Sequence, residues 1–88
     1  MKNQKSTTKD ELFLIKLHQM ALATGDAMAE IDRYVIGKAI GQNDKGINTI
    51  VKHLAQANFV KKGEGNVLYL TTHGLGLVDA LLKDFGLM

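Results

Sequence analysis

The segment Gly41-Gln42-Asn43 constrains the chain most, because it separates two stretches of helical apolar spacing by only three residues. Before it, residues 32–40 place apolar side chains at helical intervals behind Asp32, a residue type favoured as an N-cap. After it, Asn43 is placed to cap a helix over 43–57, and glycine at position 41 permits a sharp reversal. The sequence therefore predicts two helices joined by a tight turn.

A longer helix is predicted over residues 9–24. Thr8 and Glu11 have the spacing of a capping box, in which each side chain accepts a hydrogen bond from the other residue's backbone amide. Apolar residues then cover so much of the circumference that this helix is either central to the domain or buried in a partner. Residues 26–31 are ambiguous between a loop and a helical start.

The apolar spacing changes from helical to alternating after Asn58, whose residue type suits a left-handed helix end. Strands are predicted over 59–62 and 67–71, and the glycine-containing segment between them indicates a β-hairpin. Thr71 or Thr72 then caps a last helix.

That last helix is predicted over 72–85, and Gly86 marks its end. The expected fold is mainly α with a small β-hairpin, an α+β arrangement. We expect one domain over residues 9–88, preceded by a flexible basic arm over residues 1–8.

Composition sets the class of protein. A chain of 88 residues with 45% hydrophobic and 23% charged residues has the balance of one folded domain. Without cysteine it forms no disulfide or thiolate metal site, which suits a reducing compartment. No apolar run reaches the roughly 20 residues needed to span a bilayer, and MKNQKSTTK lacks the apolar stretch of a signal peptide. We therefore expect a cytoplasmic protein without a membrane partner.

The net charge is only +2, but its distribution along the chain is uneven. Residues 1–9 and 33–62 are mainly basic, whereas residues 10–32 are mainly acidic. This asymmetry is compatible with one positive and one negative face, and equally with an ordinary solvated surface.

Five segments carry a resemblance to a known family. They are a capped helix ending in glycine (32–41), a turn (42–45), three apolar helix positions (Ile47, Val51 and Leu54), Asn-Phe-Val at 58–60, and Leu-Thr-Thr-His-Gly at 70–74. In this order and spacing they resemble the winged helix-turn-helix domain of MarR-like and PadR-like transcriptional regulators. The resemblance covers about residues 10–85.

The resemblance implies sequence-specific DNA binding by a small transcriptional regulator, with the helix over 43–57 in the major groove and the hairpin, or wing, along the backbone. Carried over residue by residue, it implies these DNA-binding side chains: Asn43, Lys45, Asn48, Thr49, Lys52, Lys61 and Lys62. Asn43 would help to hold a phosphate, Asn48 would pair with adenine, and the Thr49 methyl would contact thymine. The alternative is a winged-helix protein–protein interaction module that binds no DNA.

Two residues near this helix have open interpretations. Gly46 leaves room for close approach of the backbone either to DNA or to the preceding helix. Tyr34 contacts a phosphate or packs against the first helix.

The terminal helices carry more apolar residues than one small domain readily covers, which favours a homodimer. The candidate interface residues are Leu14, Leu75, Val78, Leu82 and Phe85. The alternative is that the two helices bury each other within one chain.

The sequence predicts no catalytic or metal site. His18, His53 and His73 are far apart in the sequence and have no cysteine beside them, whereas metal binding needs several converging ligands. The carboxylates between residues 10 and 32 are not paired with a nucleophile. We therefore expect no enzymatic activity, no cofactor, no metal and no small-molecule ligand; the expected partners are double-stranded DNA and a second copy of the chain.

Overall fold

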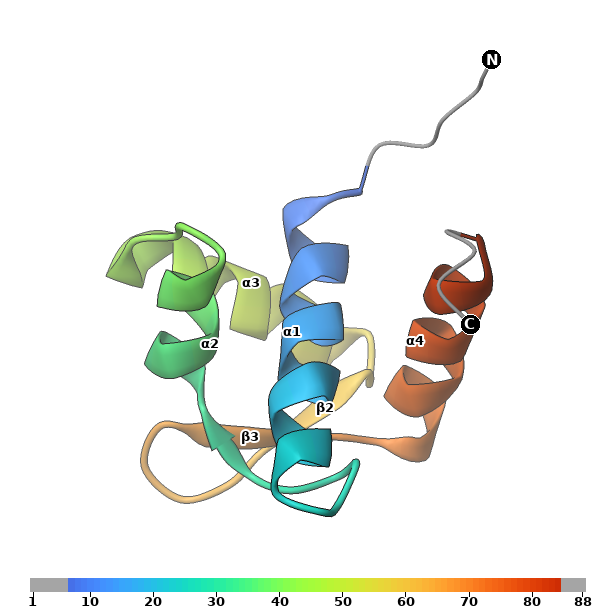
Figure 1. Ribbon diagram of the computed structural model, residues 1–88. Coiled ribbons are helices and arrows are strands. Elements are labelled where there is room, and N and C mark those ends of the chain that lie inside the picture. Colours follow the sequence, from blue (N-terminus) through green and yellow to red (C-terminus); the bar gives the residue numbers. More distant parts are fainter. Residues whose placement is uncertain (1–6, 85–88) are drawn as a thin grey trace.

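Residues 7–84 are described by the computed structural model, and they form four helices and three short strands (Figure 1). The elements are α1 (Lys9–Ala23), β1 (Ile31–Asp32), α2 (Arg33–Ala39), α3 (Asp44–Gln56), β2 (Val60–Lys62), β3 (Val67–Leu70) and α4 (Thr72–Asp84). The strands form one antiparallel sheet in the order β1-β3-β2. The prediction of a mainly helical α+β fold is confirmed.

Helix α1 occupies the centre of the molecule (Figure 1). Helices α2 and α3 lie on one side of it and α4 on the other, while the sheet crosses below its C-terminal half. The core-facing residues of α1, Phe13, Leu14, Leu17 and Ala21, are fully buried against neighbours within the chain. Part of its broad apolar surface stays uncovered, because Leu12 and Leu22 are exposed. Within residues 7–84, no helix combines the length and the apolar character that crossing a bilayer requires.

Each helix begins at a side chain that the sequence predicted as a cap. The Thr8–Glu11 capping box is present in both directions. At α4, Thr71 rather than Thr72 performs this role, since its hydroxyl oxygen accepts the amide of Gly74 at 2.9 Å. The other two caps are Asp32 for α2 and Asn43 for α3.

The predicted reversals also form where the residue types permit them. Gly41 adopts a φ of 81° just after the C-cap of α2, and Asn58 adopts a φ of 65° just after the C-cap of α3. Both values lie in the left-handed region that glycine and asparagine tolerate best. The first reversal sets the crossing of α2 and α3, and the second directs the chain into β2.

Strand β1 was not predicted. Residues 26–31, left ambiguous by the sequence, contain no helix, and Ile31 and Asp32 pair with Leu68 and Val67 of β3. This short strand makes β3 the central strand of the sheet. It also brings the start of α2 against the hairpin, where the amide of Arg33 donates to the carbonyl oxygen of Asn66 at 2.9 Å.

One hydrophobic core joins all four helices to the sheet. No polar or charged side chain is buried within the described part of the chain. The core side chains are Phe13, Leu14, Leu17, Ile36, Ile47, Ile50, Val51, Leu54, Val60, Leu68, Leu70 and Val78.

This core corrects part of the predicted dimer interface. Leu14 and Val78 are fully buried where α1 and α4 pack together, so neither side chain has surface left for a second copy. Leu75 and Leu82 are only partly buried and lie against the core. Phe85, the predicted helix end at Gly86 and the first six residues of the predicted basic arm lie outside the described residues.

Candidate nucleic-acid interface

Helix α3 has one buried and one exposed face. Its apolar residues at helical spacing enter the core, as the sequence predicted. This packing fixes the rotation of the helix about its own axis. It leaves a row of polar side chains exposed along the opposite face, consisting of Lys45, Asn48, Thr49 and Lys52.

Residues of the chain itself cap the start of α3 and offset the negative charge of Asp44 there. Asn43 Oδ1 accepts the amide of Gly46 at 2.8 Å, so this side-chain oxygen serves the helix. Asp44 lies 3.8 Å from the ammonium nitrogen of Lys38, and the two side chains are well exposed. An exposed pair of this kind stabilises the fold by at most about 1 kcal/mol, but it offsets the negative charge at the helix start.

Gly46 makes room for this cap. A Cβ at position 46 would lie 2.7 Å from Gln42 Oε1 and 3.2 Å from Asn43 Oδ1. Of the two interpretations left open for Gly46, the one that involves α2 has no contact behind it, since the nearest atoms belong to the turn and the cap. The glycine that allows α2 and α3 to approach each other closely is Gly37, where a Cβ would overlap the side chain of Ile47.

Asn48 is held by two residues from the start of α2. Its Oδ1 accepts hydrogen bonds from Arg33 Nη1 and from the hydroxyl of Tyr34, both at 3.2 Å. Arg33 Nε also donates to the carbonyl oxygen of Asn66 in the hairpin turn, at 3.4 Å. The guanidinium thus joins α2, α3 and the hairpin, which makes Arg33 a site residue that the sequence reasoning missed.

This arrangement bears on two predictions. Bidentate pairing with adenine needs both an acceptor and a donor from Asn48. The oxygen that would be the acceptor already accepts hydrogen bonds from Arg33 and Tyr34, so the arrangement does not favour this pairing. Tyr34 packs its ring against the core and directs its hydroxyl to Asn48, which is a contact that neither alternative for Tyr34 included. The one feature of the sequence that could have identified Arg33 as a site residue is that it is the sole arginine of the chain.

Thr49 presents mainly its methyl group. Its hydroxyl donates to the carbonyl oxygen of Lys45 at 3.1 Å, one turn earlier in α3. Such a bond engages the oxygen with the helix backbone. The methyl group remains for outside contacts, which is compatible with the predicted contact to thymine.

The two hairpin lysines are exposed but lie on opposite faces of the sheet. Lys61 pairs with Tyr69 and Lys62 with the buried Leu68, and successive side chains on a strand point to opposite faces. Lys61 therefore shares the face away from the core with Tyr69. The contacts that the resemblance implies for Lys61 and Lys62 stay a prediction, and a duplex would meet the two side chains from different faces of the sheet.

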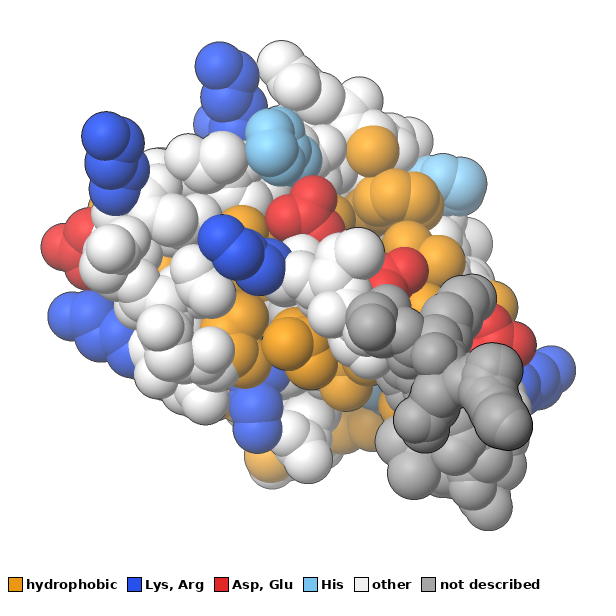
Figure 2. Space-filling model, turned by 90° about the horizontal axis from the view of Figure 1, so that it is seen from above, with side chains coloured by type: hydrophobic (Ala, Val, Ile, Leu, Met, Phe, Trp, Pro, Cys, Tyr) orange, Lys and Arg blue, Asp and Glu red, His pale blue; other side chains and the backbone are white. Residues whose placement is uncertain are grey.

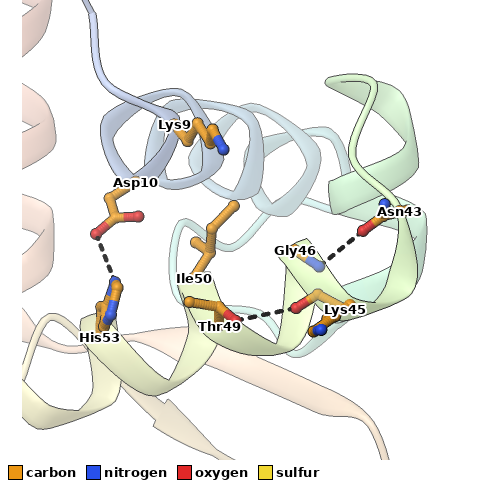
Figure 3. A pocket seen from close by; sticks show the side chains of 8 residues that line it. All are labelled: Lys9, Asp10, Asn43, Lys45, Gly46, Thr49, Ile50 and His53. Atoms are coloured by element: carbon orange, nitrogen blue, oxygen red, sulfur yellow. Dashed lines mark hydrogen bonds and ion pairs between the residues drawn. The ribbon is translucent and has the colours of Figure 1, made fainter.

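A hollow of about 320 Å³ lies between the start of α1 and α3 (Figure 3). His53 and Asp10 point toward each other at one end of it, with 3.5 Å between Nδ1 and Oδ2. The remaining lining residues are Lys9, Asn43, Lys45, Gly46, Thr49 and Ile50. Since most of these belong to α3 or its cap, the hollow continues the polar surface of that helix.

The visible positive side chains are unevenly placed. Seen from above, most lysine and arginine side chains lie on the half of the molecule that contains α2 and α3 (Figure 2). Acidic side chains are visible on both halves (Figure 2). Between residues 7 and 84, no three histidine, cysteine or carboxylate side chains converge as a metal site would require.

Comparison of the chain with protein-family models, with curated proteins and with solved structures found no match.

Proposed function

We propose that this protein is a small winged helix-turn-helix transcriptional regulator that binds double-stranded DNA sequence-specifically. The observation that carries the proposal is the exposed polar row of α3, Lys45, Asn48, Thr49 and Lys52, on a helix whose opposite face is fixed in the core. In this proposal α3 enters the major groove and presents this row to base edges and phosphates.

The order of the elements supports the proposal. A helix, a short strand, two helices joined by a tight turn, a hairpin and a last helix follow one another along the chain. In a winged helix the hairpin serves as the wing beside the reading helix. Here the hairpin turn is tied to the start of α2 through Arg33 and Asn66, so it is held at a fixed position relative to α3.

The charge distribution supports the same face. Lys38, Lys45, Lys52, Arg33 and Lys61 belong to α2, α3 and the hairpin. Because phosphate contacts supply a large share of the affinity for DNA, a duplex would approach the half where the visible positive side chains gather.

We further propose that the regulator acts as a homodimer through the side formed by α1 and α4. This side lies across the molecule from α2, and α4 packs on α1 and β3. Pairing there would leave both copies of α3 exposed. A two-fold dimer would then present two reading helices to two half-sites of a palindromic operator.

The test is a titration of the protein against mixed-sequence duplex DNA at several salt concentrations. About four to six phosphate contacts would give a slope of about −4 to −5 in a plot of log K against log salt, at about −0.9 per contact. No measurable binding at low salt would refute the proposal. It would leave the interaction-module alternative, in which α3 or the α1–α4 side binds a protein.

Two substitutions then separate phosphate contacts from base reading. We expect Lys52→Ala to weaken binding to every duplex alike and to reduce the salt slope by about 1. Asn48→Ala should relax the preference at one operator position. The matched control is Lys83→Ala, which removes an exposed lysine from α4 and should change neither quantity. An equal loss from Lys52→Ala and Lys83→Ala would show that α3 is not the DNA-binding helix.

A further inference from the structure

We infer that Arg33 and Tyr34 hold the side-chain amide of Asn48 so that it offers DNA only N–H donors, and that this selects guanine over adenine at the contacted position. The inference rests on the proposed binding of DNA by α3. It replaces the adenine contact implied by the resemblance. Asn48 would be the base-reading residue, and Arg33 and Tyr34 would be positioning residues that act through it.

The orientation of the amide follows from the chemistry of its partners. Arg33 Nη1 lies 3.2 Å from Asn48 Oδ1, and a guanidinium has donors but no acceptor. The carbonyl oxygen of the amide must therefore face Arg33, since the amide nitrogen would meet another donor there. The hydroxyl of Tyr34 donates to the same oxygen at 3.2 Å.

These two bonds use the acceptor capacity of Asn48. A side-chain carbonyl oxygen has two lone pairs, and each of the two donors takes one. The Nδ2 group carries two N–H donors and diverges from the oxygen in the amide plane. Since Asn48 is exposed on the outer face of α3, the donor group is the part of its amide that remains for a ligand.

The two donors are themselves held in place. The backbone amide and Nε of Arg33 both donate to the carbonyl oxygen of Asn66, at 2.9 Å and 3.4 Å. The backbone amide of Tyr34 donates to the N-cap oxygen of Asp32 at 2.7 Å, and its ring packs against the core. A reading group supported in this way keeps its orientation when the ligand arrives.

The base edges in the major groove respond differently to a donor-only amide. Guanine presents two neighbouring acceptors, N7 and O6, so both can receive N–H groups. Adenine presents N7 beside the N6 amino group, which is a donor and needs the acceptor that Asn48 no longer has. Thymine presents the single acceptor O4, and cytosine presents only the N4 amino donor. Guanine is therefore the best match.

The experiment begins with selection of a preferred duplex from a randomised pool, followed by affinity measurements with each base at the position that depends on Asn48. For the unmodified protein we expect guanine to be bound about fivefold or more tightly than adenine at that position. Tyr34→Phe keeps the ring and releases one lone pair of Oδ1. It should lower the guanine-to-adenine ratio, while Arg33 Nη1 continues to hold the oxygen.

The other tyrosine of the chain provides the matched control. Tyr69 lies on β3 opposite Lys61, and no described hydrogen bond joins its hydroxyl to Asn48. Tyr69→Phe should therefore leave the ratio unchanged. Preference for adenine by the unmodified protein, or an unaltered ratio in Tyr34→Phe, would overturn the inference while leaving DNA binding by α3 intact.

A measurement without DNA separates the two proposals further. The side-chain amide resonance of Asn48 should shift in Tyr34→Phe, because its carbonyl oxygen loses a hydrogen bond, and should stay in place in Tyr69→Phe. An unmoved resonance in Tyr34→Phe would refute the inference whether or not the protein binds DNA. A shifted resonance in a protein that binds no duplex would refute the proposed function and, with it, guanine selection.

Discussion

Gly37 shows how strictly a single position is constrained where α2 crosses α3. A Cβ added there would overlap Cγ1 and Cδ1 of Ile47, and Ile47 is fully buried at the start of α3, so its side chain has no space to move into. Overpacking of this kind costs about 1–3 kcal/mol, whereas alanine gains only about 0.5–1 kcal/mol over glycine inside a helix. The steric effect should therefore win.

We expect Gly37→Ala to lower the free energy of unfolding by up to about 2.5 kcal/mol, the largest difference between these two effects. Urea denaturation followed by circular dichroism measures it. Gly76→Ala is the matched control, because Gly76 lies within α4, is exposed and has no atom within 4 Å of its Cβ position. It should raise stability by about 0.5–1 kcal/mol. Equal effects from the two substitutions would contradict the close packing of α2 on α3.

Residue-scale prediction from the sequence succeeded where the partner is near in the chain. The cap at Asn43 involves an amide three residues away, and the residue type alone indicates it. The partners of Asn48 lie 14 and 15 residues earlier, on another helix. Their contact depends on how α2 crosses α3, which helical periodicity does not specify.

At the scale of elements, α1 depends on its first turn. The hydroxyl oxygen of Thr8 accepts the amide of Glu11 at 3.1 Å, and the Glu11 carboxylate accepts the amide of Thr8 at 3.0 Å. Because α1 contacts every other helix, loss of this cap should weaken the whole fold rather than one end of it. We expect Thr8→Ala to lower the unfolding free energy by about 0.5–2 kcal/mol.

Thermal or urea unfolding of Thr8→Ala beside Thr8→Ser tests this expectation. Serine retains the accepting hydroxyl, so its stability should stay within a few tenths of a kcal/mol of the unmodified chain. If serine and alanine destabilised equally, the methyl group of Thr8 rather than its hydrogen bond would carry the effect.

Elements with several turns or a clear alternation were predictable, and β1 was not. The helices begin at their predicted caps, and the hairpin strands follow their alternation. Strand β1 has two residues, Ile31 and Asp32, which is too short for any period to be visible. It forms because the backbone of β3 pairs with it, so its existence depends on tertiary structure. Yet β1 places Arg33 beside the hairpin, and the candidate site depends on it.

At the scale of the whole molecule, the side formed by α1 and α4 carries exposed apolar surface. Leu22 is 52% exposed and borders a hollow of about 270 Å³ together with Ile15, His18, Gln19 and Leu82. The sequence predicted an interface on these helices but could not distinguish its exposed residues from those that the two helices bury against each other. The structure makes that distinction, because Leu14 and Val78 are core residues and Leu22 is not.

The proposed homodimer therefore predicts that Leu22→Glu shifts the protein toward monomer. A carboxylate there would have to be desolvated against the apolar surface of the second copy, which is costly without a partner charge. Sedimentation over a range of protein concentrations measures the change, and we expect at least a tenfold rise in the dimer dissociation constant, equivalent to about 1.4 kcal/mol. Val35→Glu is the matched control, since Val35 is 56% exposed on α2, away from α4. A monomeric unmodified protein, or an equal shift from both substitutions, would contradict assembly through the α1–α4 side.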